Sequence, residues 1–175
     1  LTMADSVRFS VYCTPVEELT DENSGERSVL ASEIGKSLGG SGTATVSAYN
    51  GIAADQGYLN ATVNYLEAPD GAGNEVQISS ESSASFVFIK NTGHVFSSAT
   101  VLGDAETSLT LKVTTNSGAI LISLLAAGEA IVLKGRQSGS GAVIVASGIK
   151  VETVLSNGAD TSDGNHLAVE YLVVD

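Results

Sequence analysis

Ser108-Leu-Thr-Leu-Lys-Val-Thr114 is the stretch that decides the fold, because apolar and polar side chains alternate along it without a break. Leu109, Leu111 and Val113 fall on one face, and the polar residues between them fall on the other. A period of two is typical of a β-strand with one buried face. The stretch therefore predicts a strand in a sheet that covers an apolar core.

Similar strand patterns recur along the chain and are separated by turns of glycine, asparagine, aspartate and serine. They cover residues 7–13, 43–49, 61–66, 76–79, 85–90, 119–124, 130–134, 142–146, 149–155 and 166–174. Short strands without helices between them favour an antiparallel sandwich or barrel over βαβ units. We therefore predict an all-β fold, an antiparallel β-sandwich of jelly-roll type, forming a single domain over residues 1–175.

The first strand pattern places Val7, Phe9, Val11 and Cys13 on one face. We expect this face to lie inward, so that Cys13 is a buried thiol that acts as a small hydrophobic side chain. Cys13 is the only cysteine of the chain, which excludes a disulfide within one molecule.

A polar N-terminal excursion over residues 14–42 follows this strand. We expect it to be a long loop or arm with a short helix at Ser28–Leu38, ended by the Gly39-Gly-Ser-Gly42 turn. Uninterrupted loops of this length in a compact domain are usually functional or mobile. We therefore assign a partner-contact role to its acidic residues, which are Glu17, Glu18, Asp21, Glu22 and Glu26.

The charge balance excludes two classes of partner. The 175 residues hold 8 Lys and Arg against 20 Asp and Glu, a net charge of −12. Such a chain repels phosphate backbones and anionic membrane surfaces, so we expect neither nucleic acid nor membrane as a partner. The most apolar stretch, Ala119–Leu133, is 15 residues long and contains Gly128 and Glu129. It is too short to span a bilayer and predicts two strands joined by a turn.

No motif for catalysis, a cofactor or a metal stands out, and we predict that the protein is not an enzyme. The only histidines are His94 and His166. A hydrolase triad that uses one of them stays open, because triad residues meet in space rather than in sequence. Calcium is an alternative at two loops rich in oxygen ligands, although the same residues are common in turns. One loop holds Asp70, Asn74 and Glu75, and the other holds Asp160, Asp163 and Asn165.

Three segments carry a resemblance to a known class of proteins. They are Ser85-Phe-Val-Phe-Ile-Lys-Asn-Thr-Gly93, Leu125-Ala-Ala-Gly-Glu-Ala-Ile-Val-Leu133 and Leu167-Ala-Val-Glu-Tyr-Leu172. The chain from 85 to 175 is similar to small virion proteins of tailed bacteriophages, in the style of capsid decoration, or cement, proteins. In those proteins a strand ends in Lys-Asn-Thr-Gly, and an Ala-Gly-Glu turn joins two apolar strands.

The resemblance implies a non-enzymatic, usually trimeric protein on the outer surface of the capsid, bound to the major capsid protein. A homotrimer that packs through sandwich edges also fits a chain with few charges to keep sheet edges apart. A tail or fibre component is the alternative within the virion. A glycan-binding adhesin domain is the alternative of a different class, for which the tyrosines are Tyr12, Tyr49, Tyr58, Tyr65 and Tyr171.

Overall fold

The computed structural model describes residues 6–13, 17–20, 27–31, 38–45, 56–59, 62–71, 73–81, 84–115, 120–135, 144–161 and 164–174. The chain divides into two compact units. The larger unit is Ala44–Asp175 with Leu1–Asp5, and the smaller unit is Ser6–Thr43.

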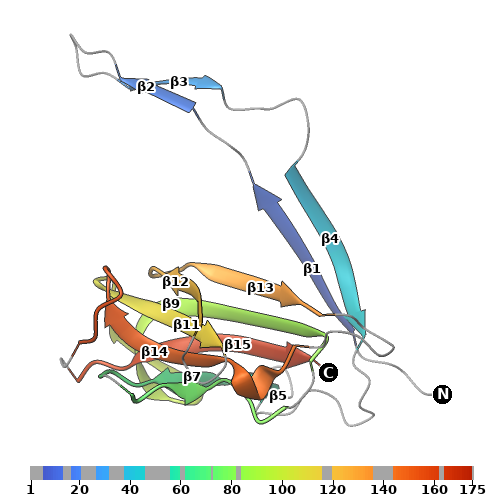
Figure 1. Ribbon diagram of the computed structural model, residues 1–175, viewed down its shortest axis with the longest axis vertical. Helices are drawn as coiled ribbons and strands as arrows, with labels where there is room; N and C mark the ends of the chain where they lie inside the picture. The colour runs from blue at the N-terminus through green and yellow to red at the C-terminus, as the bar shows by residue number, and fades with distance from the viewer. Residues whose placement is uncertain are drawn as a thin grey trace. The chain divides into compact units, whose positions relative to one another are not determined.

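The first sheet of the larger unit is built around the long strand β9 (Phe86–Ser98). Its strands lie in the order β10-β9-β15-β7, and β13 pairs with β9 beside this path. Figure 1 shows β13 next to β9. The strand pairs described in this sheet are all antiparallel. The other four strands are β7 (Tyr65–Ala68), β10 (Val101–Ala105), β13 (Ala130–Lys134) and β15 (Leu167–Val174).

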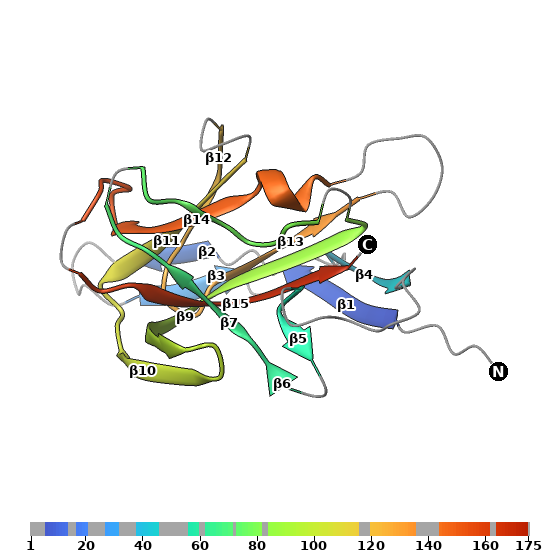
Figure 2. The ribbon, with the colours of Figure 1, turned by 90° about the horizontal axis from the view of Figure 1, so that it is seen from below.

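The second sheet has the strand order β12-β11-β14-β8, again with antiparallel pairs. Figure 2 shows it as a second layer against the first sheet. Its strands are β8 (Val76–Gln77), β11 (Leu109–Thr115), β12 (Ile120–Leu125) and β14 (Lys150–Leu155). The larger unit also contains the short pair β5 (Tyr58–Leu59) and β6 (Thr62–Val63) and a 3₁₀ helix at Ala146–Gly148.

The core lies between these two sheets. Leu111 and Val113 of β11 are fully buried, and they belong to one apolar cluster with Ile89 of β9 and Val169 and Val173 of β15. Burial of one such side chain contributes about 1.5–3 kcal/mol to folding. The all-β antiparallel sandwich is confirmed, with the stretch at 108–114 as an inner strand, whereas the jelly-roll arrangement stays a prediction.

The smaller unit corrects the predicted excursion. It contains β1 (Ser6–Cys13) paired with β4 (Leu38–Thr45), and β2 (Glu17–Thr20) paired antiparallel with β3 (Arg27–Ala31). The predicted helix at Ser28–Leu38 is wrong over β3, where strand pairing with β2 takes its place. The Gly39–Gly42 run is likewise not a turn, because it lies inside β4.

The first strand pattern is correct as a strand, but the packing predicted for it holds only in part: Val7 and Phe9 are half-buried, whereas Val11 is exposed. β1 pairs only with β4 among the described strands, and the side chain of Val11 is 53% exposed. Alternation alone shows that two faces differ; it does not show that one of them reaches a core. The side chain of Cys13 lies outside the described residues, so its burial stays a prediction.

β9 does not end at the Lys-Asn-Thr-Gly sequence; it continues to Ser98. Opposite Leu167 and Val169 of β15 the register shifts, so that extra β9 residues form a bulge there. Gly93 adopts a φ of 74°, and the buried Asn91 side-chain oxygen accepts its N–H at 2.9 Å. This bond satisfies the main chain within the bulge, which allows turn-like residues to stay in the sheet.

The structure contains one strand that the sequence patterns miss and lacks one that they predict. The missed strand is β10, because Val101–Ala105 includes Gly103 and Asp104 and lacks a regular alternation. The strand predicted at 142–146 has its first residues outside the described part, and Ala146 begins the 3₁₀ helix instead.

Truncation of Leu111 to Ala tests the position of the core. Leu111 is fully buried, and we expect the variant to lose about 2–5 kcal/mol of unfolding free energy because it leaves a cavity between the sheets. Leu155→Ala is the matched control, since the Leu155 side chain is 39% exposed and leaves a smaller cavity. Urea unfolding of both variants measures the difference, and equal losses would contradict this core.

Candidate functional site

The β1–β4 ribbon depends on glycine for its close strand contact. An added Cβ at Gly42 would lie 2.8 Å from Cζ of Phe9, because the aromatic ring covers that position. An added Cβ at Gly39 would lie 2.8 Å from the carbonyl oxygen of Val11. A side chain at either position therefore requires the partner strand or the ring to move.

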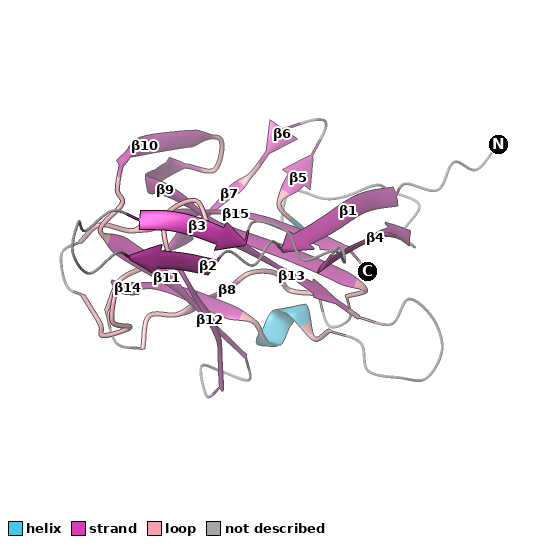
Figure 3. Cartoon of the chain, turned by 90° about the horizontal axis from the view of Figure 1, so that it is seen from above, coloured by secondary structure: helices cyan, strands magenta, loops and turns pink. Residues whose placement is uncertain are grey.

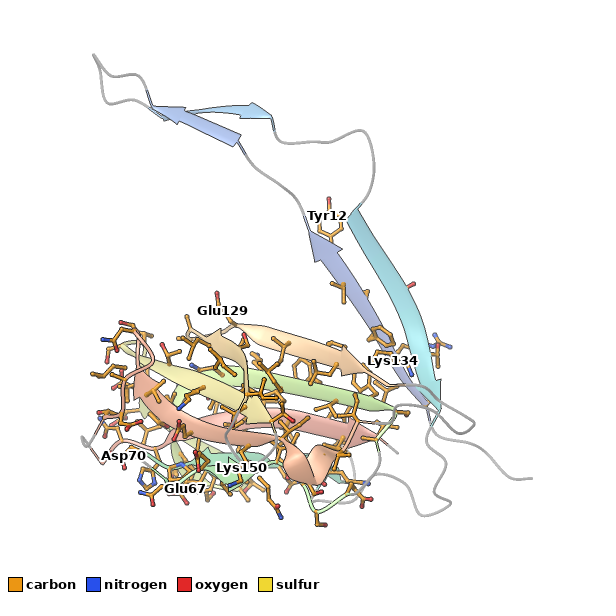
Figure 4. The ribbon with its side chains drawn as sticks, viewed as in Figure 1. Tyr12, Glu67, Asp70, Glu129, Lys134 and Lys150 are labelled. Carbon is orange, nitrogen blue, oxygen red and sulfur yellow. The ribbon has the colours of Figure 1, made fainter. Side chains whose placement is uncertain are left out.

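The same ribbon exposes apolar surface. The side chain of Tyr12, labelled in Figure 4, is 75% exposed, and that of neighbouring Val11 is more than half exposed. No side chain that the structure describes within Ser6–Thr43 is buried. Two-stranded sheets are marginally stable in water on their own, and exposed tyrosines are enriched at protein interfaces. The ribbon is therefore a candidate contact element.

The acidic residues assigned to partner contact are only partly placed. Glu17 and Glu18 lie on β2, where their Cα partners on β3 are Ala31 and Val29. Their side chains lie outside the described residues, as do Asp21, Glu22 and Glu26 altogether. The contact role of the five residues stays a prediction.

A second candidate site is the cluster of His166 with two carboxylates at one end of the sandwich. The Nδ1 atom of His166 lies 2.5 Å from Glu67 Oε1, and Nε2 lies 3.2 Å from Asp70 Oδ1. The other Asp70 oxygen accepts the N–H of Gly164 at 2.8 Å. Figure 4 shows Glu67 and Asp70 close together on the β7 side. The cluster therefore ties the segment before β15 to the edge strand β7.

The two carboxylates favour the protonated imidazole. Only the imidazolium can donate from both ring nitrogens, whereas a neutral ring presents a lone pair to one carboxylate. The hydrogen bond with Glu67, followed by the charges of Glu67 and Asp70, raises the pKa of His166, and partial burial opposes this effect. No local pattern predicts the cluster, because Glu67 and His166 are 99 positions apart in the chain.

The recorded contacts of both histidines favour structural roles. The ring nitrogens of His166 face carboxylates, and Nδ1 of His94 lies 3.1 Å from the carbonyl oxygen of Gly103. Among the described residues, no hydroxyl or thiol group contacts either imidazole ring. The hydrolase alternative therefore gains no support from them.

The two calcium alternatives likewise gain no support. Asp70 is engaged by His166 and Gly164, Glu75 lies 3.8 Å from the Lys150 ammonium, and the Asn74 amide donates to the Asp70 carbonyl. Asp163 lies outside the described residues. In the part of the chain that is described, no three His, Cys, Asp or Glu residues are grouped as metal ligands.

Comparison with known proteins returns no family model, no curated protein and no solved structure that matches the chain. Within the described residues, no helix is long and apolar enough to cross a membrane.

The His166 cluster predicts a pH dependence of stability. Because folding raises the pKa above its usual 6.5, the stabilisation is fully present below that value and is lost as pH rises through the folded pKa. We expect His166→Gln to cost less than about 1 kcal/mol at low pH, because solvent screens the cluster, and nothing at high pH. Urea unfolding between about pH 5 and pH 8 measures this, and a cost independent of pH would contradict the role.

Proposed function

We propose that this chain is a non-enzymatic structural virion protein, a capsid decoration protein of a tailed bacteriophage. It binds the major capsid protein on the outer surface of the capsid and assembles as a homotrimer. The observation that carries the proposal is the smaller unit, in which no described side chain is buried while Tyr12 is 75% exposed. A unit whose described side chains are not buried gains stability by packing against a partner.

The charge arrangement of the sandwich supports a place on an exposed surface. Lys90 lies 3.4 Å from Glu170, Lys112 pairs with the buried Glu152, and Lys150 pairs with Glu75. Lysines are thus engaged within the molecule, whereas the chain keeps a net charge of −12. Such a surface repels DNA and other polyanions, which suits a protein that covers a DNA-filled shell.

The resemblance to decoration proteins gives further support. Its three segments fall in β9, in the β12–β13 connection and in β15, all of which belong to the sandwich. A glycan-binding adhesin needs a groove with at least two exposed tyrosines. The tyrosines with the largest exposure among the described residues are Tyr12 and Tyr58, and they lie in different units. A tail or fibre location stays the alternative within the virion.

Deletion of residues 6–43, the smaller unit with Tyr12, tests the contact role of this unit. We expect the variant to keep the β signal of the sandwich in circular dichroism and to lose binding to undecorated capsids in co-sedimentation. Capsid binding equal to that of the full chain would contradict the assignment.

Single substitutions in the full chain test the same role while leaving the rest of the smaller unit in place. Tyr12→Asp places a charge on the exposed ribbon. We expect it to weaken capsid binding at least about tenfold, because the carboxylate is buried without a partner when the ribbon binds the capsid. Tyr58→Asp is the matched control, since Tyr58 is 38% exposed and lies in the larger unit. Equal effects of the two substitutions would contradict a contact centred on the ribbon.

A further inference from the structure

The most apolar stretch of the chain forms one side of the sandwich. Residues 119–133 contain β12, a turn and most of β13. β12 is the last strand of its sheet, and β13 pairs with β9 and with no other described strand. Figure 3 shows β12 at the rim of the sandwich. The chain thus crosses from one sheet to the other here, and among the described strands β12 and β13 each have one edge without a partner strand.

The opposite side, at β7 and β8, is closed by bonds between the sheets. Thr153 of β14 is fully buried; its N–H donates to the Pro69 carbonyl at 2.8 Å and its hydroxyl donates to the Ala68 carbonyl at 2.7 Å. The same hydroxyl accepts the N–H of Leu167 at 3.0 Å. The Glu67–His166–Asp70 cluster lies on the same side and joins β7 to the segment before β15 within the first sheet. The two sides of the sandwich are therefore not equivalent.

The free edge of β13 is regular. Asn91 N–H donates to the Glu129 carbonyl at 3.0 Å, and Gly135 N–H donates to the Ser85 carbonyl at 2.9 Å. Odd-numbered residues thus direct their main-chain groups to β9. Because alternate residues of an antiparallel strand point to opposite sides, the N–H and C=O of Ala130 and Val132 face the open edge. The pairing with β9 shows no register shift over Ala130–Lys134.

β12 adds exposed apolar side chains to this edge. Ile120 is 56% exposed, Leu121 is 55% exposed and Leu124 is 36% exposed. An exposed apolar edge strand is a template for association, and soluble proteins normally protect such edges with charges, bulges or short strands. β12 has one register shift in its pairing with β11 and carries no charged residue.

The other open edges of the described sandwich carry stronger protection. β10 contains Asp104 and has two register shifts, β7 contains Glu67, and β8 is 2 residues long. Two charged residues lie at the ends of β13, Glu129 just before it and Lys134 as its last residue, and both are exposed and hydrogen-bonded to the main chain. Glu129 accepts the N–H of Ala126 at 2.8 Å, and the Lys134 ammonium donates to the Ser85 carbonyl at 3.2 Å. Figure 4 shows these two residues at opposite ends of β13.

We infer that the β12–β13 edge is the surface with which the chain binds a second copy of itself. Copies with a net charge of −12 repel one another over most of their surface, and they repel least along β12 and β13, whose only charged residue is Lys134. A basic partner gains little from such an edge, whereas a second apolar strand matches it. Symmetric packing around a common axis then buries the edges of all copies.

This inference deepens the proposed homotrimer by naming its contact surface. It is tested with the purified full-length chain alone, so its failure is distinct from a failure to bind capsids. A chain that self-associates through this edge and ignores capsids would refute only the decoration role.

Sedimentation velocity from about 1 to 100 μM protein measures the self-association, a range that covers micromolar dissociation constants. We expect the wild-type chain to form a closed oligomer in this range. Leu121→Lys is expected to weaken association at least about tenfold, because the ammonium is desolvated in the contact. Val101→Lys on β10 is the matched control, since Val101 is also 55% exposed and receives the same charge.

Val132→Pro provides a second, independent variant. The Val132 N–H faces away from β9, so proline removes no bond within the sheet and is tolerated at an edge. We expect an unchanged circular dichroism spectrum and weakened association. A monomeric wild-type chain at the highest concentration would overturn the inference, as would unchanged association of both Leu121→Lys and Val132→Pro. Association lost equally in Val101→Lys would show that charge, rather than this edge, decides it.

Discussion

The contact between the two sheets through Thr153 is the constraint on which the arrangement of the sandwich depends. This buried threonine of β14 bonds to main-chain groups of Ala68, Pro69 and Leu167, so one residue of the second sheet holds the two neighbouring strands β7 and β15 of the first. An unsatisfied hydroxyl at this position would cost about 1–3 kcal/mol. The bonds align the sheets, and apolar packing between them provides most of the stability.

The closure at Thr153 gives the sandwich two different sides. One side is fastened by polar bonds between sheets, and the other consists of edge strands linked by the turn after β12. On that side Asn91 supplies the corresponding bond, since its side-chain amide donates to the Leu125 carbonyl at 2.9 Å. This bond fixes the crossing of the chain without occupying the free edges of β12 and β13. The exposed apolar surface of β12 is therefore a product of the fold rather than a separate site.

Much of the sandwich was predictable from the sequence, because alternation marks strands with one buried face. The pattern at 108–114 predicted β11, and the pattern at 166–174 predicted β15 almost to its ends. Alternation was a poor guide to burial in β1, where Val11 is 53% exposed. The glycine run predicted a turn at Gly39–Gly42, but these glycines lie in β4 and allow its close contact with β1.

The candidate sites were less predictable than the strands. The cluster of Glu67, Asp70 and His166 forms only because β7 and β15 are neighbours in the sheet. Local sequence patterns predict strands but do not predict the order of strands in a sheet. The open edge has the same origin. Its apolar residues were visible as the stretch 119–133, but their position at the rim follows from the pairing of β12 and β13 with one strand each.

Residue-resolved amide hydrogen exchange tests the central claim, an open β12–β13 edge that a second copy covers. In dilute protein the amides of Ile131 and Leu133, which point to β9, should be protected, and that of Val132 should exchange fast. In concentrated protein the Val132 amide should become protected together with the outer amides of β12, while the amides of β10 stay unchanged. Fast exchange of Val132 at every concentration would contradict the account.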